Sequence, residues 1–343
     1  MRPALKPGLL PVWRDRDTLQ IGIDPRRAVA LTGMAGVSCV ISLLDGSRDR
    51  DQVLAAAYEH GIPAETADRV LTLLAAGGAL DDFPAGTLRV LPQPLRARLA
   101  AELATVSLAR QDSDGGARTL ARRRAAYIRI RGTGRIAGSI RSILVAAGIG
   151  DVSGGSDPEP QPPRPDPTLA ARVPTARMPP RPGRKTRARP SAGRPPAGQP
   201  LPDLAVLIGQ PDPELSAALM SDRTPHLVAS ASEAIGVVGP LVVPGRTACL
   251  RCLDLHRTDR DPAWPLILAQ LAGRQPIPLA CDASLAVAVA AQATSQVLAF
   301  VDSAAAPDAV ANGTLELVLP GWQWRRRTWS PHERCSCGTS DPR

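Results

Sequence analysis

The chain has 343 residues, of which 44% are hydrophobic and 3% aromatic, and its formal net charge is +9. This length allows two or three domains, whose cores must be built from Ala, Val, Leu and Ile. The charge does not indicate a folded nucleic-acid-binding face, because residues 160–200 hold nine basic residues and one acid and so account for +8 of it. The N-terminus lacks an apolar signal core, and the longest apolar run, 284–301, contains the polar stretch QATSQ. We therefore expect a cytoplasmic protein with a buried amphipathic helix there and no membrane span.

Residues 1–83 indicate one module of short strands followed by three helices. A hairpin is predicted around LQIGIDPRRAVAL, and three apolar stripes at helical spacing follow it. This order predicts a winged-helix-like unit. A DNA-binding winged helix needs basic residues on its third helix, but this helix has only Arg69, beside Glu65 and Asp68, so nucleic acid is a disfavoured partner.

The same module resembles the PqqD-like peptide-recognition domain in LKPGLL, the LQIGIDPRRAVAL hairpin, the LLDGSRDRDQVL turn and the closing LLAAGGALDDF. The resemblance implies a domain from the biosynthesis of ribosomally made, modified peptides, which captures a precursor leader as an added β-strand. Here it implies a peptide-binding edge near Val29 and Leu31, with Arg69 on the third helix beside it. The alternative is a cap that only packs on the next domain. Residues 84–125 predict a helical connection.

A glycine-rich turn between a strand and a helix follows residue 126. In RGTGRIAG, Gly132, Gly134 and Ala137 fit the pattern G-x-G-x-x-A, and Gly138 comes next. Such glycines allow a tight turn and the close approach of a phosphate, which the helix N-terminus attracts. The same pattern also serves close packing of a strand on a helix with nothing bound.

Four cysteines near the end of the chain form two close pairs: Cys249 and Cys252 in CLRC, and Cys335 and Cys337 in CSC. Four thiolates satisfy a closed, tetrahedral structural Zn²⁺ site, which leaves no catalytic position open. The alternative is oxidised or inert cysteines, although bridges between adjacent cysteines are strained and no secretory signal is present. His256 and His332 lie close enough in sequence to replace a ligand, but two surface histidines are the simpler interpretation.

RGTGRIAG with VAAGIGDV resembles the opening of the ThiF-type, ubiquitin-activating-enzyme-like fold, and CLRC with the terminal CSC resembles its zinc clamp. With the N-terminal module, the chain resembles the leader-binding partner protein of thiazole/oxazole-forming cyclodehydratases. The resemblance implies an α/β fold, in which the winged-helix-like module precedes a reduced Rossmann-like core over 126–151 and 201–343. It implies structural zinc, an ATP–Mg²⁺ site, a precursor leader peptide and a separate cyclodehydratase-like enzyme as partners, and it leaves homodimer formation open.

Residues 152–200 depart from that family. Adenylating members continue with a second strand that ends in a ribose-binding acid, but this chain has fifteen prolines between 158 and 202. Proline lacks the N–H that a sheet needs, so we expect a disordered, polyproline-leaning linker. The charges left as candidate nucleotide contacts are Asp157, Glu159, Asp166, Arg184 and Lys185, with Asp212 as the acid on the magnesium side. The turn is present without the charges that adenylyl transfer requires.

The lead hypothesis is therefore a non-catalytic adaptor that presents a precursor peptide to a modifying enzyme. The alternatives are an ATP-dependent adenylyltransferase acting on a peptide carboxylate, and a DNA-binding regulator. WQWRRRTW alternates Trp with Arg, which favours a strand with snorkelling arginines over a stacking surface made by Trp322, Trp324 and Trp329. Cys39 and Cys281 are most simply buried hydrophobes, with Cys281 as an acceptor thiol the alternative.

Overall fold

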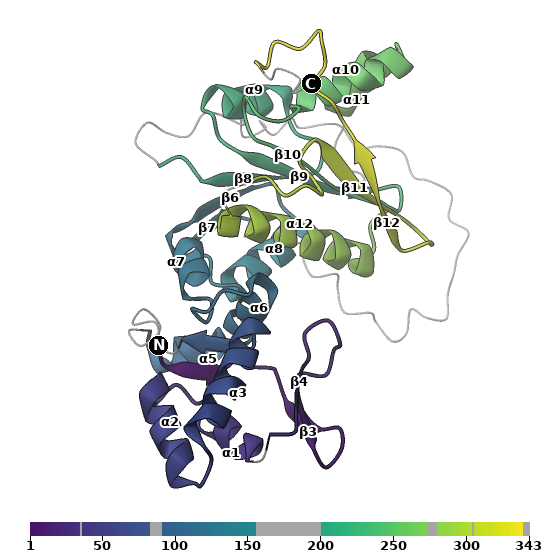
Figure 1. Ribbon diagram of the computed structural model, residues 1–343. Helices are drawn as coiled ribbons and strands as arrows, with labels where there is room; N and C mark the ends of the chain where they lie inside the picture. The colour runs from purple at the N-terminus through teal and green to yellow at the C-terminus, as the bar shows by residue number, and fades with distance from the viewer. Residues whose placement is uncertain (35, 83–90, 156–199, 273–279, 304, 339–343) are drawn as a thin grey trace, which may run out of the picture. The chain divides into compact units, whose positions relative to one another are not determined.

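The computed structural model describes residues 1–34, 36–82, 91–155, 200–272, 280–303 and 305–338. The proline-rich segment expected to form a linker lies almost entirely outside these residues. The chain divides into two compact units, Met1–Ala125 with Ala146–Gly148, and Ala126–Val145 with Ile149–Arg343 (Figure 1).

The first unit contains the expected short strands followed by three helices. Its elements are β1 (Pro3–Leu5), β2 (Pro11–Trp13), β3 (Thr18–Ile21), β4 (Val29–Thr32), α1 (Val37–Ser42), α2 (Arg50–Glu59), α3 (Ala64–Ala76), β5 (Leu80–Asp82), α5 (Gln93–Arg98), α6 (Ala100–Arg110) and α7 (Ala117–Ala125). Strands β2, β3 and β4 form an antiparallel sheet in that order, and β1 pairs with β5. Helix α3 buries the stripe predicted from its 3.6-residue spacing: Ala67, Val70, Leu71 and Leu74.

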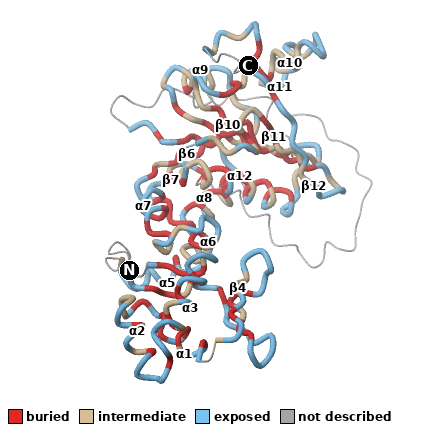
Figure 2. The backbone as a smooth tube through the Cα atoms, viewed as in Figure 1, coloured by how far each residue is buried: buried red, intermediate tan, exposed pale blue. Residues whose placement is uncertain are grey.

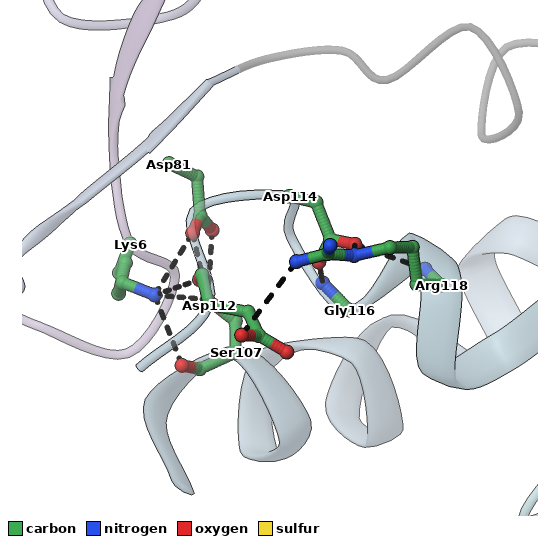
Figure 3. Close-up of polar contacts among 7 residues, drawn as sticks. All are labelled: Lys6, Asp81, Ser107, Asp112, Asp114, Gly116 and Arg118. Carbon is green, nitrogen blue, oxygen red and sulfur yellow. Dashed lines mark hydrogen bonds and ion pairs between the residues drawn. The ribbon is translucent and has the colours of Figure 1, made fainter. Parts of the chain in front are cut away.

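The helices of residues 84–125 belong to the first unit, so they are more than a connection between domains. The buried Lys6 ammonium holds the start of the chain to helix α6 (Figure 3). Its Nζ lies 2.9 Å from Asp81 Oδ1 and donates to Ser107 Oγ at 2.7 Å and to the carbonyl of Asp112 at 2.6 Å. A buried ammonium needs this complete set of oxygen partners, because it has lost its hydration.

The second unit is built on a seven-stranded mixed sheet. Its elements are β6 (Tyr127–Arg131), α8 (Arg135–Ala146), β7 (Asp151–Gly154), β8 (Leu204–Ile208), α9 (Pro213–Ser221), β9 (His226–Ser232), β10 (Ile235–Val242), α10 (Leu250–Arg260), α11 (Trp264–Ala272), α12 (Ala283–Ser303), β11 (Gly313–Val318) and β12 (Gln323–Thr328). The strand order is β12-β11-β10-β9-β8-β6-β7. Strands β7, β6, β8 and β9 are parallel to one another, and β10, β11 and β12 are each antiparallel to the strand before them in the chain. The α/β class predicted for this part is therefore confirmed.

Strand β7 corrects the predicted start of the linker at residue 152. Asp151–Gly154 pairs in parallel with β6. The second strand that the resemblance led us to expect after the first helix of this unit is therefore present. The Arg141 guanidinium donates to the carbonyl of Gly154 at 3.0 Å and to that of Val152, which fixes the strand end. The prolines that suggested a linker begin only at residue 158, beyond this strand.

Helix α12 is the single helix among the described residues whose length and apolarity would let it cross a membrane. It packs against β9 and β10 and buries one side in the core of the second unit (Figure 2). Leu285, Val289 and Val297 lie on this buried side. This packing agrees with the buried amphipathic helix expected from the sequence.

Candidate functional site

The four predicted cysteines come together in the second unit. Cys249 precedes α10 and Cys252 lies in its first turn, while Cys335 and Cys337 come from the tail after β12. The Sγ of Cys249 lies 3.7 Å from that of Cys252 and 3.6 Å from that of Cys335, and the Sγ atoms of Cys252 and Cys337 are 3.7 Å apart. A tetrahedron with Zn–S bonds of about 2.3 Å has sulfur–sulfur edges of about 3.8 Å. The four thiols therefore fit a zinc ion.

The electrostatics of the cluster favour a thiolate at Cys252. The pKa of Cys252 is lowered, first by the hydrogen bond that the Cys249 thiol donates and also by the backbone N–H of His332. The same hydrogen bond, with burial, raises the pKa of Cys249. Metal binding must release the remaining thiol protons, so the affinity for zinc rises with pH.

The two histidines left as alternative ligands are occupied by other partners. His332 is buried, contrary to the surface position expected, and its Nε2 lies 2.8 Å from Asp259 Oδ2. Its Nδ1 accepts from the backbone N–H of Arg334 at 3.1 Å. His256 Nε2 lies 2.9 Å from the carbonyl of Ser330. These contacts fasten the tail to α10, so the histidines support the cysteine cluster without belonging to it.

The glycines of the turn between β6 and α8 divide into two kinds. A Cβ added to Gly132 would lie 2.7 Å from the Cβ of Ile208, and φ of Gly132 is +122°, so this glycine is required for packing. A Cβ at Gly134 or Gly138 would meet no heavy atom within 4 Å. Ala137 is fully buried and serves the core. Only Gly134 and Gly138 leave space into which a ligand could approach.

Asp212, the candidate acid on the magnesium side, is committed to a structural contact. It precedes α9, and its Oδ1 accepts from the backbone N–H of Glu214 at 2.8 Å, which caps the helix. The other candidate nucleotide contacts, between residues 157 and 185, lie outside the described residues.

The predicted peptide-binding edge is the outer strand β4. The backbone N–H of Gly33 donates to Asp17 at 3.0 Å, and the register continues through Leu31 opposite Leu19. Hydrogen-bonded and non-bonded pairs alternate in an antiparallel ladder, so Leu31 faces β3 with its backbone groups, while those of Ala30 and Thr32 face outward.

This register changes the residues that can contact a peptide. Leu31 is 0% exposed, and its side chain lies in the core. Val29 packs against Gly77, where an added Cβ would lie 2.3 Å from Val29 Cγ2. Sequence reasoning missed Ala30 and Thr32, whose exposed positions follow from strand alternation once the register is known.

A cavity of about 220 Å³ adjoins the first residues of β4. It is lined by Leu9, Arg26, Arg27, Ala28, Val29, Gly77, Gly78, Leu108 and Gln111. The Arg27 guanidinium donates to the carbonyl of Leu108, and Arg26 pairs with Asp24 at 2.7 Å. Arg69, the predicted contact on α3, is exposed and lies two helical turns before Gly77 on one row of side chains.

The other edge of this sheet offers fewer backbone donors. On β2, the backbone of Leu10 accepts from Gly22 at 2.8 Å and Arg14 donates to Thr18 at 3.0 Å. The outward positions on β2 are therefore Pro11 and Trp13. Proline has no N–H to offer at an edge.

The tryptophan–arginine stretch forms β12, as the strand interpretation predicted. Trp324 packs against the core of the second unit. Trp329 is 2% exposed, and its Nε1 donates to Thr314 Oγ1 at 3.0 Å. Trp322 is 48% exposed before the strand begins. The three indoles therefore do not form one stacking surface.

No family model matches the sequence, and neither does any curated protein. Solved structures do match. The heterocyclase TruD aligns with a TM-score of 0.61 and 17% identity over 98% of this chain and 43% of that chain. E. coli MccB with AMPCPP and MccA aligns with a TM-score of 0.61 and 14% identity, over 99% of this chain and 100% of the MccB chain. A heterocyclase in complex with substrate and cofactor aligns with a TM-score of 0.60 and 14% identity, over 99% of this chain and 39% of the heterocyclase chain.

The chain spans the full length of MccB but less than half of either heterocyclase chain. At these identities the likeness shows the fold, a mixed α/β architecture shared with TruD and MccB. The α/β fold expected from the resemblance is therefore confirmed as a fold.

Proposed function

We propose that this protein is a non-catalytic adaptor in the biosynthesis of ribosomally made, thiazole/oxazole-type peptides. It binds the leader of a precursor peptide along β4 and presents the core peptide to a separate cyclodehydratase-like enzyme in the cytoplasm. The observation that carries the proposal is the contrast between the two edges of the first unit's sheet. Pro11 leaves β2 with the single outward N–H of Trp13, whereas β4 directs the N–H groups of both Ala30 and Thr32 outward.

The features around β4 support peptide pairing. Ala30 and Thr32 carry small, exposed side chains, so a peptide strand can approach the backbone. Main-chain hydrogen bonds supply affinity in this mode of recognition, and adjoining pockets supply selectivity. The cavity beside Val29 and Gly77 is such a pocket, and its lining includes both apolar residues, such as Leu9, and the two arginines Arg26 and Arg27. The leader of a peptide with an apolar residue next to an acid fits it.

The binding experiment uses leaders of the precursor peptides encoded beside this gene, labelled and titrated by fluorescence anisotropy. Ala30→Pro removes one outward N–H without touching the ladder to β3, and Ala30→Val is the matched control that keeps it. One main-chain hydrogen bond contributes about 0.5–1.5 kcal/mol net, so the proline variant should bind roughly two- to thirteenfold more weakly. Equal affinities for the two variants, or no leader binding to the unaltered protein, would refute the proposal.

The second candidate is an ATP-dependent adenylyltransferase that activates a peptide carboxylate. The open space at Gly134 and Gly138 favours it, and MccB is known in complex with AMPCPP and with ATP. The commitment of Asp212 to helix capping disfavours it.

Calorimetry with ATP–Mg²⁺ separates the two candidates. Binding by the unaltered protein that is lost in Gly134→Val, together with ATP-dependent turnover, would establish the adenylating enzyme. If the protein is an adaptor, it should neither bind ATP–Mg²⁺ nor turn over ATP. The unaltered protein and Gly134→Val should then bind the leader with the same affinity.

Structural zinc is part of the proposal. The complete set of four thiolate ligands gives the ion no vacant position for substrate. Homodimer formation remains a proposal that sedimentation of the purified protein would test.

A further inference from the structure

Strand β12 gives the second unit an open sheet edge. It is the last strand of the sheet as the described residues form it, with β11 on one side only (Figure 1). The backbone N–H of Trp329 donates to Asn312 at 2.9 Å, in register with the ladder between β11 and β12. The alternation of an antiparallel ladder then turns the backbone groups of Trp324, Arg326 and Thr328 outward.

Arginines gather on one face beside this edge. Arg325 and Arg327 project to the same side of β12 as the indole of Trp329. The guanidinium carbons of Arg327, Arg257 and Arg260 lie 4.6, 5.5 and 5.7 Å from the centre of the Trp329 ring. We call Arg257, Arg260, Arg325 and Arg327 the arginine edge.

The arginine edge has more cations than acids to balance them. Arg257 pairs with Asp254 at 3.3 Å, and Arg327 lies 3.9 Å from Glu316. Within the described parts of the chain, no carboxylate lies within 4.0 Å of Arg260 or Arg325. Three guanidinium groups around one indole repel one another, so an additional carboxylate at this place would be stabilised.

An exposed apolar pair lies at the other end of the strand. Val318 is 49% exposed on the same face as Arg325, and Trp322 stands in the turn between β11 and β12. Six residues of β12 span roughly 20 Å between this pair and Arg260. Trp and Arg are the residues most enriched among those that dominate binding energy at interfaces.

We propose that the arginine edge docks an acidic β-strand segment of another protein. The segment pairs with the outward backbone groups of Trp324, Arg326 and Thr328. Its alternate side chains place carboxylates at Arg325 and Arg260 and an apolar residue beside Gln323, which lies between the added strand and Val318. Neutral and basic strands are excluded, because they would leave the crowded cations unpaired. The identification of the partner as the modifying enzyme rests on the proposed function, whereas the chemistry of the segment rests on this surface alone.

The first test uses a synthetic probe of about ten residues that alternates glutamate with threonine and ends in leucine. Its affinity for the full chain is measured by fluorescence anisotropy at roughly 50 and 300 mM salt. Arg325→Glu and Arg260→Glu should each weaken binding about tenfold, and so should the higher salt. Arg14→Glu, at an exposed position in the first unit, makes the same charge change and should leave affinity within about twofold.

Hydrogen exchange tests the strand pairing. With the probe bound, the amides of Trp324, Arg326 and Thr328 should exchange about tenfold more slowly, whereas those of Arg325 and Arg327, already bonded to β11, should change little. Absence of probe binding, equal losses in Arg14→Glu and Arg325→Glu, or unchanged exchange at the outward amides would each overturn the proposal.

Leader affinity measured on the same samples separates this inference from the proposed function. Ala30→Pro should weaken binding of the leader and leave binding of the acidic probe unchanged. Arg325→Glu should weaken binding of the acidic probe and leave binding of the leader unchanged. Loss of both ligands in one variant would contradict the assignment of separate surfaces.

Discussion

Lys6→Met should destabilise the first unit by about 3–5 kcal/mol, the range for breaking a buried ion pair by removing one partner. The Lys6 side chain is 1% exposed and that of Asp81 is 4% exposed. In the variant, the hydrogen bond from Ser107 Oγ, at 2.8 Å, is the one that the Asp81 carboxylate keeps among the described residues. The carbonyl of Asp112 also loses the ammonium donor, and that of Ser107 keeps only the backbone N–H of Gln111 at 3.1 Å among the described residues (Figure 3).

The double variant Lys6→Met/Asp81→Leu isolates the reason for this loss. If the destabilisation comes from an uncompensated buried charge, removing the charge should restore part of the stability. We expect the double variant to lose less than either single variant, by about 1–3 kcal/mol.

Hydrogen exchange monitored by mass spectrometry suits this measurement, because four of the five tryptophans belong to the second unit and fluorescence would report mainly on that unit. Amides in α3 and α6 should exchange roughly 150- to 5,000-fold faster in Lys6→Met under conditions where the opening equilibrium, and not the opening rate, sets the rate of exchange. A single variant that exchanges like the unaltered protein, or a double variant less stable than both singles, would refute the reasoning.

Three further predictions concern the second unit. Removing zinc with a chelator, or Cys335→Ser, should release the tail, seen as loss of bound metal by mass spectrometry and rapid exchange after Thr328; unchanged protection would contradict a metal clamp. Burial lowers the pKa of His226, so its proton is bound more readily in the unfolded chain, and the free energy of unfolding should fall by up to about 1.4 kcal/mol per pH unit as pH drops below about 6.5. His226→Leu should reduce that slope, and an equally steep slope would exclude His226 as its source. Gly132→Ala should destabilise by about 2–4 kcal/mol and more than Gly134→Ala, because both strain a positive φ but only Gly132 also meets Ile208; equal losses in thermal unfolding would contradict this assignment.

Periodicity and ligand spacing made parts of this structure predictable from the sequence. The stripe of α3 follows from its 3.6-residue repeat, since few other arrangements bury Val70 and Leu74 together. The cysteine cluster follows from chemistry, because two close pairs of soft ligands have few alternatives in a chain without a secretory signal. Both inferences depend on residues that are near each other in sequence or identical in kind.

Long-range pairing explains what the sequence could not show. The contact between Lys6 and Asp81 joins residues 75 positions apart, and nothing in either local sequence indicates the other. The inward direction of Leu31 depends on its register with Leu19, which the partner strand sets. Strand β7 was missed because four residues that end in glycine carry almost no strand signal on their own.

The exposed sheet edges of this protein differ in a way that argues for selective pairing. An open edge invites any extended chain, so proteins block it, charge it or use it. Three of these edges can be compared: Pro11 removes a donor from β2, arginines flank β12, and β4 offers Ala30 and Thr32 without either protection. Of these three edges, only β4 has neither a proline nor flanking arginines to prevent pairing. An unprotected edge beside a pocket is better explained by a ligand that covers it, and a charged edge by a ligand of opposite charge.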